Sequence, residues 1–279
     1  MVPHPCAPHP TPPAWLERVR IVLVGTSHPG NIGGVARAMK TMGLRELALV
    51  APRCDPHTSE AVARASGADE LIHTATRHQR LEEALSDAAW VVGCSARTRT
   101  MPWPMITPRR FSSRLADEVA AAGEEARIAI LFGREDTGLT NDELAHCNAH
   151  VHIPTNPEFG SLNIAAAVQL MAYEARQAWL EAIDDDESTP LGEHLDADQA
   201  LRTAMESVEW DNPLASHADV ERLIEHLERT LILTGFHDPA QPRQLIPRLR
   251  RLLLRARLDQ METNILRGIL TSVERLAKP

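Results

Sequence analysis

The chain has 279 residues, 43% of them hydrophobic and 24% charged, which is typical of a soluble globular protein with one or two domains. No apolar run approaches the roughly 20 residues that cross a membrane. The Pro- and His-rich start, residues 1–18, lacks the basic and apolar regions of a signal peptide, and we expect a disordered arm there. The four cysteines include no C-x-x-C pair, which argues against a disulfide framework or a zinc site and favours the cytoplasm.

The net charge of −9 is unevenly distributed along the chain. Residues 181–228 contain 15 acidic side chains and two arginines, so this segment has a net charge of −13 and the remainder +4. The densest basic run, RQLIPRLRRLLLRAR, spans Arg243 to Arg257. Because binding responds to local potential rather than to total charge, an acidic protein of this kind is compatible with a polyanionic partner.

Short apolar runs alternate with helix-like segments over the first two-thirds of the chain. The predicted strands lie at residues 20–24, 46–51, 70–73, 90–93, from 128 to 132, and 151–153. The predicted helices lie at residues 32–42, 59–65, 79–88, 108–122 and 161–181. This alternation predicts an α/β domain over residues 19–183, with a mostly parallel sheet covered by helices on both faces.

An acidic, turn-rich segment interrupts this pattern, and we expect it to be a linker over residues 184–210. Beyond it, leucine and isoleucine recur at helical spacing in three stripes, which predicts a small all-helical domain over residues 211–279. The stripes are Leu223, Leu227, Leu231 and Thr234, then Leu245, Leu249, Leu252 and Leu253, then Ile265, Ile269, Val273 and Leu276.

Two polar loops, each placed between a short strand and a helix, are candidates for a ligand site. The first, Gly25 to Gly34, has neither the G-x-G-x-x-G spacing of a dinucleotide site nor a G-K-[ST] signature. Close packing of a helix on the sheet explains Gly33 and Gly34 as well as a ligand site does. From spacing alone, Arg37 in the following helix is more readily a solvated surface residue than a functional one.

The second candidate lies in the stretch from Ile128 to Glu174. Glu135 and Asp136 are a possible acid/base pair, although adjacent side chains seldom point into one pocket, and Gly138 suits a turn with positive φ. Ser161 can cap the helix that follows, and Asn163 is a poor helix former with a good hydrogen-bonding group. These patterns predict a ligand-binding α/β domain, but they do not choose a reaction.

Three motifs, which occur in a fixed order along the chain, indicate the reaction. NIGGVARAMKTMG (Asn31 to Gly43), LFGREDTGLT (Leu131 to Thr140) and IPTNPEFGSLN (Ile153 to Asn163) resemble the three motifs of the SPOUT superfamily of RNA methyltransferases, in its 2′-O-ribose branch. The opening RIVLVGTSHPGN, the segment SARTRTMPWP and the helical tail are similar to the bacterial tRNA (cytidine/uridine-2′-O)-methyltransferase J family. The resemblance covers residues 20–276 apart from the acidic linker.

The resemblance implies a C-terminal trefoil knot in the α/β domain, dimerisation through that knot, S-adenosylmethionine as methyl donor and a tRNA ribose as acceptor, at nucleotide 32 of the anticodon loop. Arg37 matches the catalytic arginine, and Asn31, Glu135 and Asn163 match its polar supporting positions. The residues implied to bind the cofactor are Cys94, Ser95, Ala96, Gly133, Ile153, Gly160, Ser161 and Leu162. No metal is expected, because a sulfonium methyl donor is already activated.

Arginine side chains stay protonated in proteins, so we expect Arg37 to orient and stabilise the reacting hydroxyl rather than to act as a base. In a dimer it can lie beside the cofactor of the other subunit. The basic tail is expected to bind tRNA phosphates, with Arg248, Arg250, Arg251 and Arg255 as candidates.

Three positions depart from the family pattern: Gly25 replaces an acidic residue, Cys94 a threonine and Gly160 a serine. Two other functions stay open, a ribosomal RNA 2′-O-methyltransferase and a non-catalytic RNA-binding protein with a knotted domain.

Overall fold

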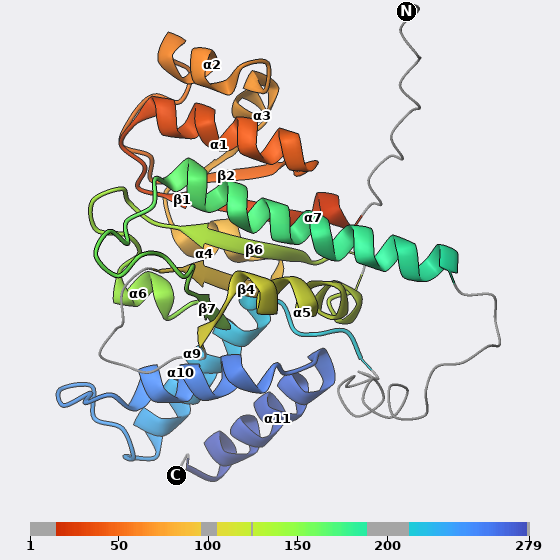
Figure 1. The fold of residues 1–279 in the computed structure, drawn as a ribbon. Coiled ribbons are helices and arrows are strands. Elements are labelled where there is room, and N and C mark those ends of the chain that lie inside the picture. Colours follow the sequence, from red (N-terminus) through yellow and green to blue (C-terminus); the bar gives the residue numbers. More distant parts are fainter. Residues whose placement is uncertain (1–14, 96–104, 124, 189–211, 278–279) are drawn as a thin grey trace, which may run out of the picture.

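The computed structural model describes residues 15–95, 105–123, 125–188 and 212–277. Its centre is a seven-stranded sheet in the order β3-β2-β1-β6-β4-β7-β5 (Figure 1). Every pair of neighbouring strands is parallel, as the alternation of strands and helices predicted. The strands are β1 Val19–Val24, β2 Glu46–Val50, β3 Thr76–His78, β4 Ala88–Cys94, β5 Met105–Ile106, β6 Arg127–Phe132 and β7 Ala149–Val151.

The helices of the sheet domain surround this sheet, and three more form a layer beneath it in Figure 1. Around the sheet lie η1 Leu16–Arg18, α1 Pro29–Met42, α2 Ser59–Ala65, α3 Asp69–His73, α4 Leu81–Leu85, α5 Pro108–Ala121, α6 Asn141–Leu144 and α7 Ile164–Ser188. The C-terminal layer consists of α9 His217–Leu233, α10 Leu245–Ala256 and α11 Gln260–Ala277. None of these described helices is long and apolar enough to span a membrane.

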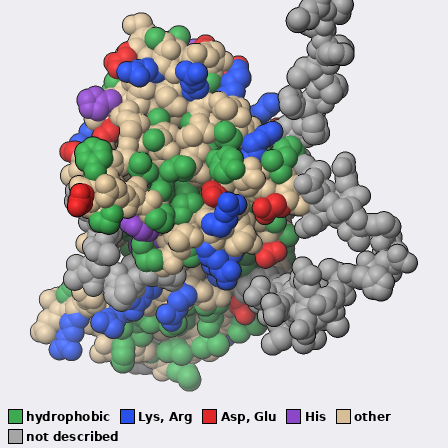
Figure 2. Space-filling model, in the orientation of Figure 1, with side chains coloured by type: hydrophobic (Ala, Val, Ile, Leu, Met, Phe, Trp, Pro, Cys, Tyr) green, Lys and Arg blue, Asp and Glu red, His purple; other side chains and the backbone are tan. Residues whose placement is uncertain are grey.

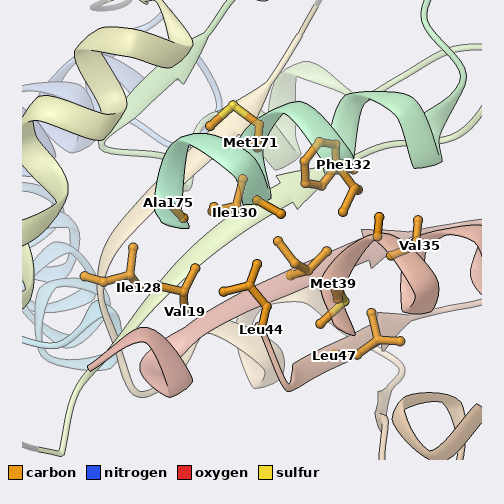
Figure 3. Packing of buried hydrophobic residues seen from close by; sticks show 14 of the residues in the cluster. Val19, Val35, Met39, Leu44, Leu47, Ile128, Ile130, Phe132, Met171 and Ala175 are labelled. Carbon is orange, nitrogen blue, oxygen red and sulfur yellow. The ribbon is translucent and has the colours of Figure 1, made fainter. Parts of the chain in front are cut away.

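Alternate residues of the central strands point into two different cores, because successive side chains of a strand face opposite ways. On one face, Ile128, Ile130 and Phe132 of β6 pack against α1 and α7, where Met39 and Met171 meet them (Figure 3). On the other face, the intervening β6 residues pack with apolar side chains of α4 and α6. The sheet is therefore buried on both faces, which explains the near-continuous apolar composition of its strands.

Glycines in α1 let its neighbours approach closely. A Cβ on Gly33 would lie 2.1 Å from the carbonyl oxygen of Ala61 in α2, and one on Gly34 would lie 3.0 Å from Cβ of Ala165 in α7. The predicted close packing is thus present, but it joins α1 to two helices rather than to the sheet.

Several predicted boundaries were wrong. Residues 70–73 belong to the helix α3, and the strand that pairs with β2 follows at Thr76–His78. The first helix begins at Pro29 rather than at residue 32, since proline suits the first helical position. The helix predicted at 79–88 spans only Leu81–Leu85. The long helix begins at Ile164 rather than at Ser161 and continues to Ser188.

Two predicted domain boundaries, the end of the N-terminal arm and the start of the acidic linker, differ from the structure. Leu16, within the predicted arm, is fully buried in the core of the sheet domain. The predicted linker begins inside α7, and the rest of it, with residues 1–14, lies outside the described residues. The trefoil knot concerns how the chain threads rather than which strands pair, and it stays a prediction.

The C-terminal helices form the predicted all-helical unit. Leu223 and Ile224 of α9 and Leu254 of α10 are buried, whereas Ile265 and Ile269 of the third predicted stripe are more than half exposed. The reason is that α11 packs through a neighbouring face, on which Leu266, Leu270 and Val273 are half-buried. On this face Glu274 accepts hydrogen bonds from Arg229 and Thr230 of α9.

Buried polar contacts attach this unit to the sheet domain. The guanidinium of Arg257 contacts the Glu118 carboxylate of α5 and the Ala89 carbonyl of β4. The Asn148 amide donates to the Leu254 carbonyl at 3.1 Å. Because these groups are removed from water, separating the two units would leave them without partners.

Candidate functional site

A cavity of about 420 Å³ opens at the carboxyl edge of the sheet. Its lining comes from the segments that follow β1, β6, β4 and β7, which are consecutive neighbours in the sheet. Because these strands are parallel, their carboxyl ends converge at this edge and bring loops far apart in the sequence together. The volume is within the usual range for a small-molecule or cofactor site.

A chain of hydrogen bonds at the cavity connects all three sequence motifs. The Asn163 amide donates to Oδ1 of Asn31 at 3.1 Å, and the Asn31 amide donates to the Glu135 carboxylate at 3.0 Å. Glu135 also accepts from the backbone N–H and the hydroxyl of Ser27, at 3.2 and 3.1 Å. The three supporting residues expected from the resemblance therefore act as one connected unit.

The hydrogen bonds around Glu135 favour its ionised form. Partial burial alone would raise its pKa, but hydrogen bonds from Asn31 and Ser27 lower the pKa below its usual value. An ionised Glu135 can accept several hydrogen bonds at once, and this gives it an organising role. The possible acid/base pairing with Asp136 finds no support, since the neighbouring Asp136 is exposed and accepts a hydrogen bond from the Thr137 hydroxyl.

The loop of the second motif folds back on itself. Arg134 and Gly138 exchange backbone hydrogen bonds of 3.3 and 2.8 Å, and Gly138 has the predicted positive φ, at 69°. A Cβ on Gly133 would lie 2.1 Å from the Gly138 carbonyl carbon, so this position tolerates no side chain. The Arg134 guanidinium makes two hydrogen bonds to Glu143, at 3.0 and 2.9 Å, and attaches the loop to α6.

The start of α7 differs from the prediction that Ser161 caps it. Oδ1 of Asn163 accepts the Ala165 N–H at 2.9 Å, so Asn163 is the capping residue. Ser161 is exposed and lines the cavity. One side chain, Asn163, therefore links the start of the helix to the polar chain of the site.

Seven of the eight residues expected to bind the cofactor line the cavity: Cys94, Ser95, Gly133, Ile153, Gly160, Ser161 and Leu162. The eighth, Ala96, lies outside the described residues. The lining includes apolar side chains of Phe132, Val151 and Ile153 together with polar side chains of the three motif loops. Burial raises the pKa of the Cys94 thiol, so Cys94 contributes a neutral side chain to the wall.

Comparison with known proteins agrees with this geometry. Residues 18–173 match the model of the SpoU rRNA Methylase family, and residues 218–279 match that of the tRNA methyltransferase TrmJ C-terminal domain. The chain belongs to the SpoU methylase family. Its match to the family model covers the whole sheet domain up to the middle of α7.

Relatives of this SpoU methylase match most of its length. The tRNA (cytidine/uridine/adenosine-2′-O-)-methyltransferase TrmJ of Pseudomonas aeruginosa is 49% identical over 94% of this chain and 96% of its own. The tRNA (cytidine/uridine-2′-O-)-methyltransferase TrmJ of Klebsiella pneumoniae is 48% identical over 94% and 99%. The crystal structure of TrmJ from Z. mobilis ZM4 is similar with a TM-score of 0.72 and 32% identity, over 91% of this chain and 98% of that one.

In this SpoU methylase, Arg37 does not line the cavity that its own chain forms. It lies on α1 six residues beyond Asn31, and its side chain is exposed. No hydrogen bond or ion pair of its guanidinium is found among the described residues. The structure thus brings together three of the four predicted catalytic positions and leaves the arginine free on the surface.

The four arginines predicted to bind RNA lie on α10 but differ in setting. Arg248 and Arg255 are exposed, and Figure 2 shows basic side chains over α10. Arg251 is half-buried, and Arg250 is turned inward to the Glu221 carboxylate. Arg248 and Arg255 are therefore the better placed to meet a polyanion.

Sequence reasoning missed several residues of the site. His28, Arg134, Thr137 and Thr155 also line the cavity. Each lies inside or beside a motif loop, so proximity in sequence to the motif was the available signal. No periodicity or spacing pointed to their side chains, because loop conformation decides which of them face inward.

Proposed function

We propose that this chain is an S-adenosylmethionine-dependent tRNA 2′-O-ribose methyltransferase that modifies cytidine or uridine at nucleotide 32 of the anticodon loop. The observation that carries the proposal is the Asn163–Asn31–Glu135 chain, which unites the three family motifs at one cavity. The name of the P. aeruginosa relative and the match of residues 218–279 to the TrmJ C-terminal domain support tRNA as the substrate.

The cavity fits S-adenosylmethionine in size and lining. Gly133 and Gly160 expose backbone close to any ligand, and Ile153 and Phe132 supply an apolar wall for an adenine ring. The lining also includes the carboxylates of Glu135 and Asp136, which favour the positive sulfonium. When bound, the cofactor supplies a methyl group on an already activated sulfur.

The protein's own part is to place the ribose hydroxyl and stabilise charge that develops on it. Asn31 is held between Glu135 and Asn163 by two hydrogen bonds. These bonds fix the start of α1, which the ribose approaches. Arg37 provides a cation for the hydroxyl oxygen and the adjacent phosphate. Alignment of the hydroxyl oxygen, methyl carbon and sulfur supplies much of the rate enhancement.

A homodimer completes this arrangement. Arg37 lies outside the cavity of its own chain, and next to α1 the outer face of α7 exposes Leu170 and Tyr173 by 42% and 43%. Hydrophobic side chains gather over α7 in Figure 2. Pairing of these faces in two subunits buries apolar surface and carries Arg37 of one subunit to the cavity of the other. Action on tRNA agrees with a cytoplasmic protein.

The test is methyl transfer from labelled S-adenosylmethionine to unmodified tRNA, followed by mass-spectrometric mapping of the product. We expect one 2′-O-methyl group per tRNA, at nucleotide 32. Methylation of ribosomal RNA but not tRNA would identify the ribosomal alternative. Calorimetry that detects no uptake of S-adenosylmethionine would identify a non-catalytic RNA-binding protein.

A further inference from the structure

Two histidines and a glutamate converge where the C-terminal helical unit meets the sheet domain. His146 lies between α6 and β7, and His217 and Glu221 occupy successive turns of α9. Nδ1 of His146 is 3.2 Å from Nε2 of His217, and both nitrogens face Oε1 of Glu221, at 3.9 and 3.8 Å. The proposed methyl transfer uses none of the three.

The three potential ligand atoms have the spacing of a metal site. An ion placed at equal distances from them would lie about 2.1 Å from each, and zinc binds histidine nitrogen and carboxylate oxygen at about 2.0–2.2 Å. Two histidines, one glutamate and a water form a known four-coordinate zinc set. The i, i+4 spacing of His217 and Glu221 places both side chains on one face of α9.

The surroundings fit a bound cation as well. His217 is 4% exposed, and among the described residues its Nδ1 has no hydrogen-bond partner, whereas its Nε2 lies 3.2 Å from Nδ1 of His146. The other nitrogen of His146 faces the Glu82 carboxylate of α4 at 3.8 Å, beyond hydrogen-bond distance, and a carboxylate on this side of the ring is the kind of group that orients a metal-binding histidine. Arg250 also contacts Oε1 of Glu221, so the ion would share this carboxylate with a guanidinium.

We propose that His146, His217 and Glu221 bind one zinc ion, which fastens the helical unit to the sheet domain. The site draws one ligand from the sheet domain and two from α9, so binding requires both units in their observed positions. An ion that binds only this arrangement stabilises it by mass action. This site is separate from the cavity and independent of the proposed methyl transfer.

The test is zinc binding by the full-length protein after treatment with a chelator. We expect one zinc per chain at this site and a rise in Tm of about 5 °C at saturating zinc. Glu221→Gln keeps the side-chain shape and should weaken binding at least about 100-fold, since loss of an outer partner alone costs about 10- to 100-fold. Glu82→Gln should weaken it by that smaller factor.

The control is His73→Gln, which replaces an exposed histidine stacked on His57 and should leave binding unchanged. Should Glu221→Gln fail to fold, cobalt added to the wild-type protein decides, since a four-coordinate site gives strong visible absorption. Absence of zinc uptake, a weak six-coordinate cobalt spectrum, or uptake that survives Glu221→Gln overturns the proposal. The last outcome would place the metal elsewhere, for example in the start MVPHPCAPHP.

Discussion

Among single residues, Glu135 is the carboxylate on which the hydrogen bonds of Ser27 and Asn31 converge. It accepts hydrogen bonds from the first-motif loop and from Asn31, and these bonds lower its pKa even though burial acts in the opposite direction. A carboxylate with a lowered pKa contributes stability that is present above its unfolded-state pKa and is lost as the pH falls through its folded-state pKa.

We therefore predict that Glu135→Gln flattens the decline in Tm below about pH 4.3, the pKa of a glutamate in an unfolded chain. The amide still accepts a hydrogen bond but no longer binds a proton in this range. Thermal unfolding between pH 3 and pH 7 measures the effect. Glu158→Gln, at an exposed position of the third-motif loop, is the control. An unchanged pH profile for Glu135→Gln would mean that Glu135 is not coupled to folding.

The glycine at position 25, where the family pattern has an acidic residue, is explained by the packing of Arg134. Its φ is +64°, and a Cβ there would lie 2.8 Å from Nε of Arg134. Glycine at this position lets Arg134 pack over the first-motif loop while it binds Glu143. An acidic side chain here, as expected from the resemblance, would require another position for Arg134.

At the scale of elements, the start of α7 joins helix capping to the chemistry of the site. Asn163 uses its oxygen to cap the helix and its amide to hold Asn31. Because the oxygen and the amide nitrogen of this side chain have different roles, a substitution that changes only the amide nitrogen separates them.

We predict that Asn163→Ala lowers stability by about 1 kcal/mol through loss of the cap and reduces methyl transfer at least 10-fold. Asn163→Asp retains the capping oxygen but cannot donate to Asn31, so it should be nearly as stable as the wild type and equally impaired in activity. Urea unfolding and turnover measure the two effects. Ser161→Ala, which removes no cap, should change stability by less than about 0.5 kcal/mol. Full activity of Asn163→Asp would refute the coupling.

The amphipathic helix α10 turns some of its arginines toward the protein and others toward solvent. Arg250 faces Glu221, whereas Arg248 and Arg255 are exposed. Basic residues of one helix thus serve both the packing of α10 against α9 and the solvent-exposed surface.

We predict that the double variant Arg248→Ala/Arg255→Ala lowers the slope of log affinity for tRNA against log salt by about 1.5, which corresponds to two lost phosphate contacts. Filter binding over a series of salt concentrations measures this slope. Arg45→Ala/Arg64→Ala, at exposed positions of the sheet domain, makes the same change in charge and should leave the slope unaltered. Equal slopes for all three proteins would exclude this surface of α10.

For the whole molecule, the position of Arg37 outside its own cavity leads to the proposal that the two halves of the active site come from different subunits. Gly133→Val should abolish cofactor binding, because the loop backbone occupies the space of any side chain. Arg37→Ala should leave the cofactor cavity intact.

We predict that a heterodimer of one Arg37→Ala subunit and one Gly133→Val subunit has about half the activity of the wild-type dimer. Its one working site would combine the intact cavity of the first subunit with Arg37 of the second. The heterodimer can be isolated with two affinity tags and compared with both inactive homodimers in a turnover assay. An inactive heterodimer would show that Arg37 serves its own subunit.

The sequence by itself determined the parallel α/β domain, the helical tail and most of the cavity lining. Apolar periodicity is a local property of the sequence, and it predicts which segments form strands and helices. Parallel strands then place the loops that follow them at one edge of the sheet. The resemblance of the ordered motifs to a known family, rather than periodicity, implied that Gly133, Ile153 and Gly160 line one site.

Only the tertiary structure decided which side chains act together. Asn31 and Asn163 are 132 residues apart, and their hydrogen bond depends on the order β1-β6-β4-β7 rather than on any local preference. The inward turn of Arg250 and the meeting of His146 with His217 depend likewise on how α9 and α10 pack. Local sequence encodes which elements form, whereas the partners of a polar side chain follow from packing between elements distant in the chain.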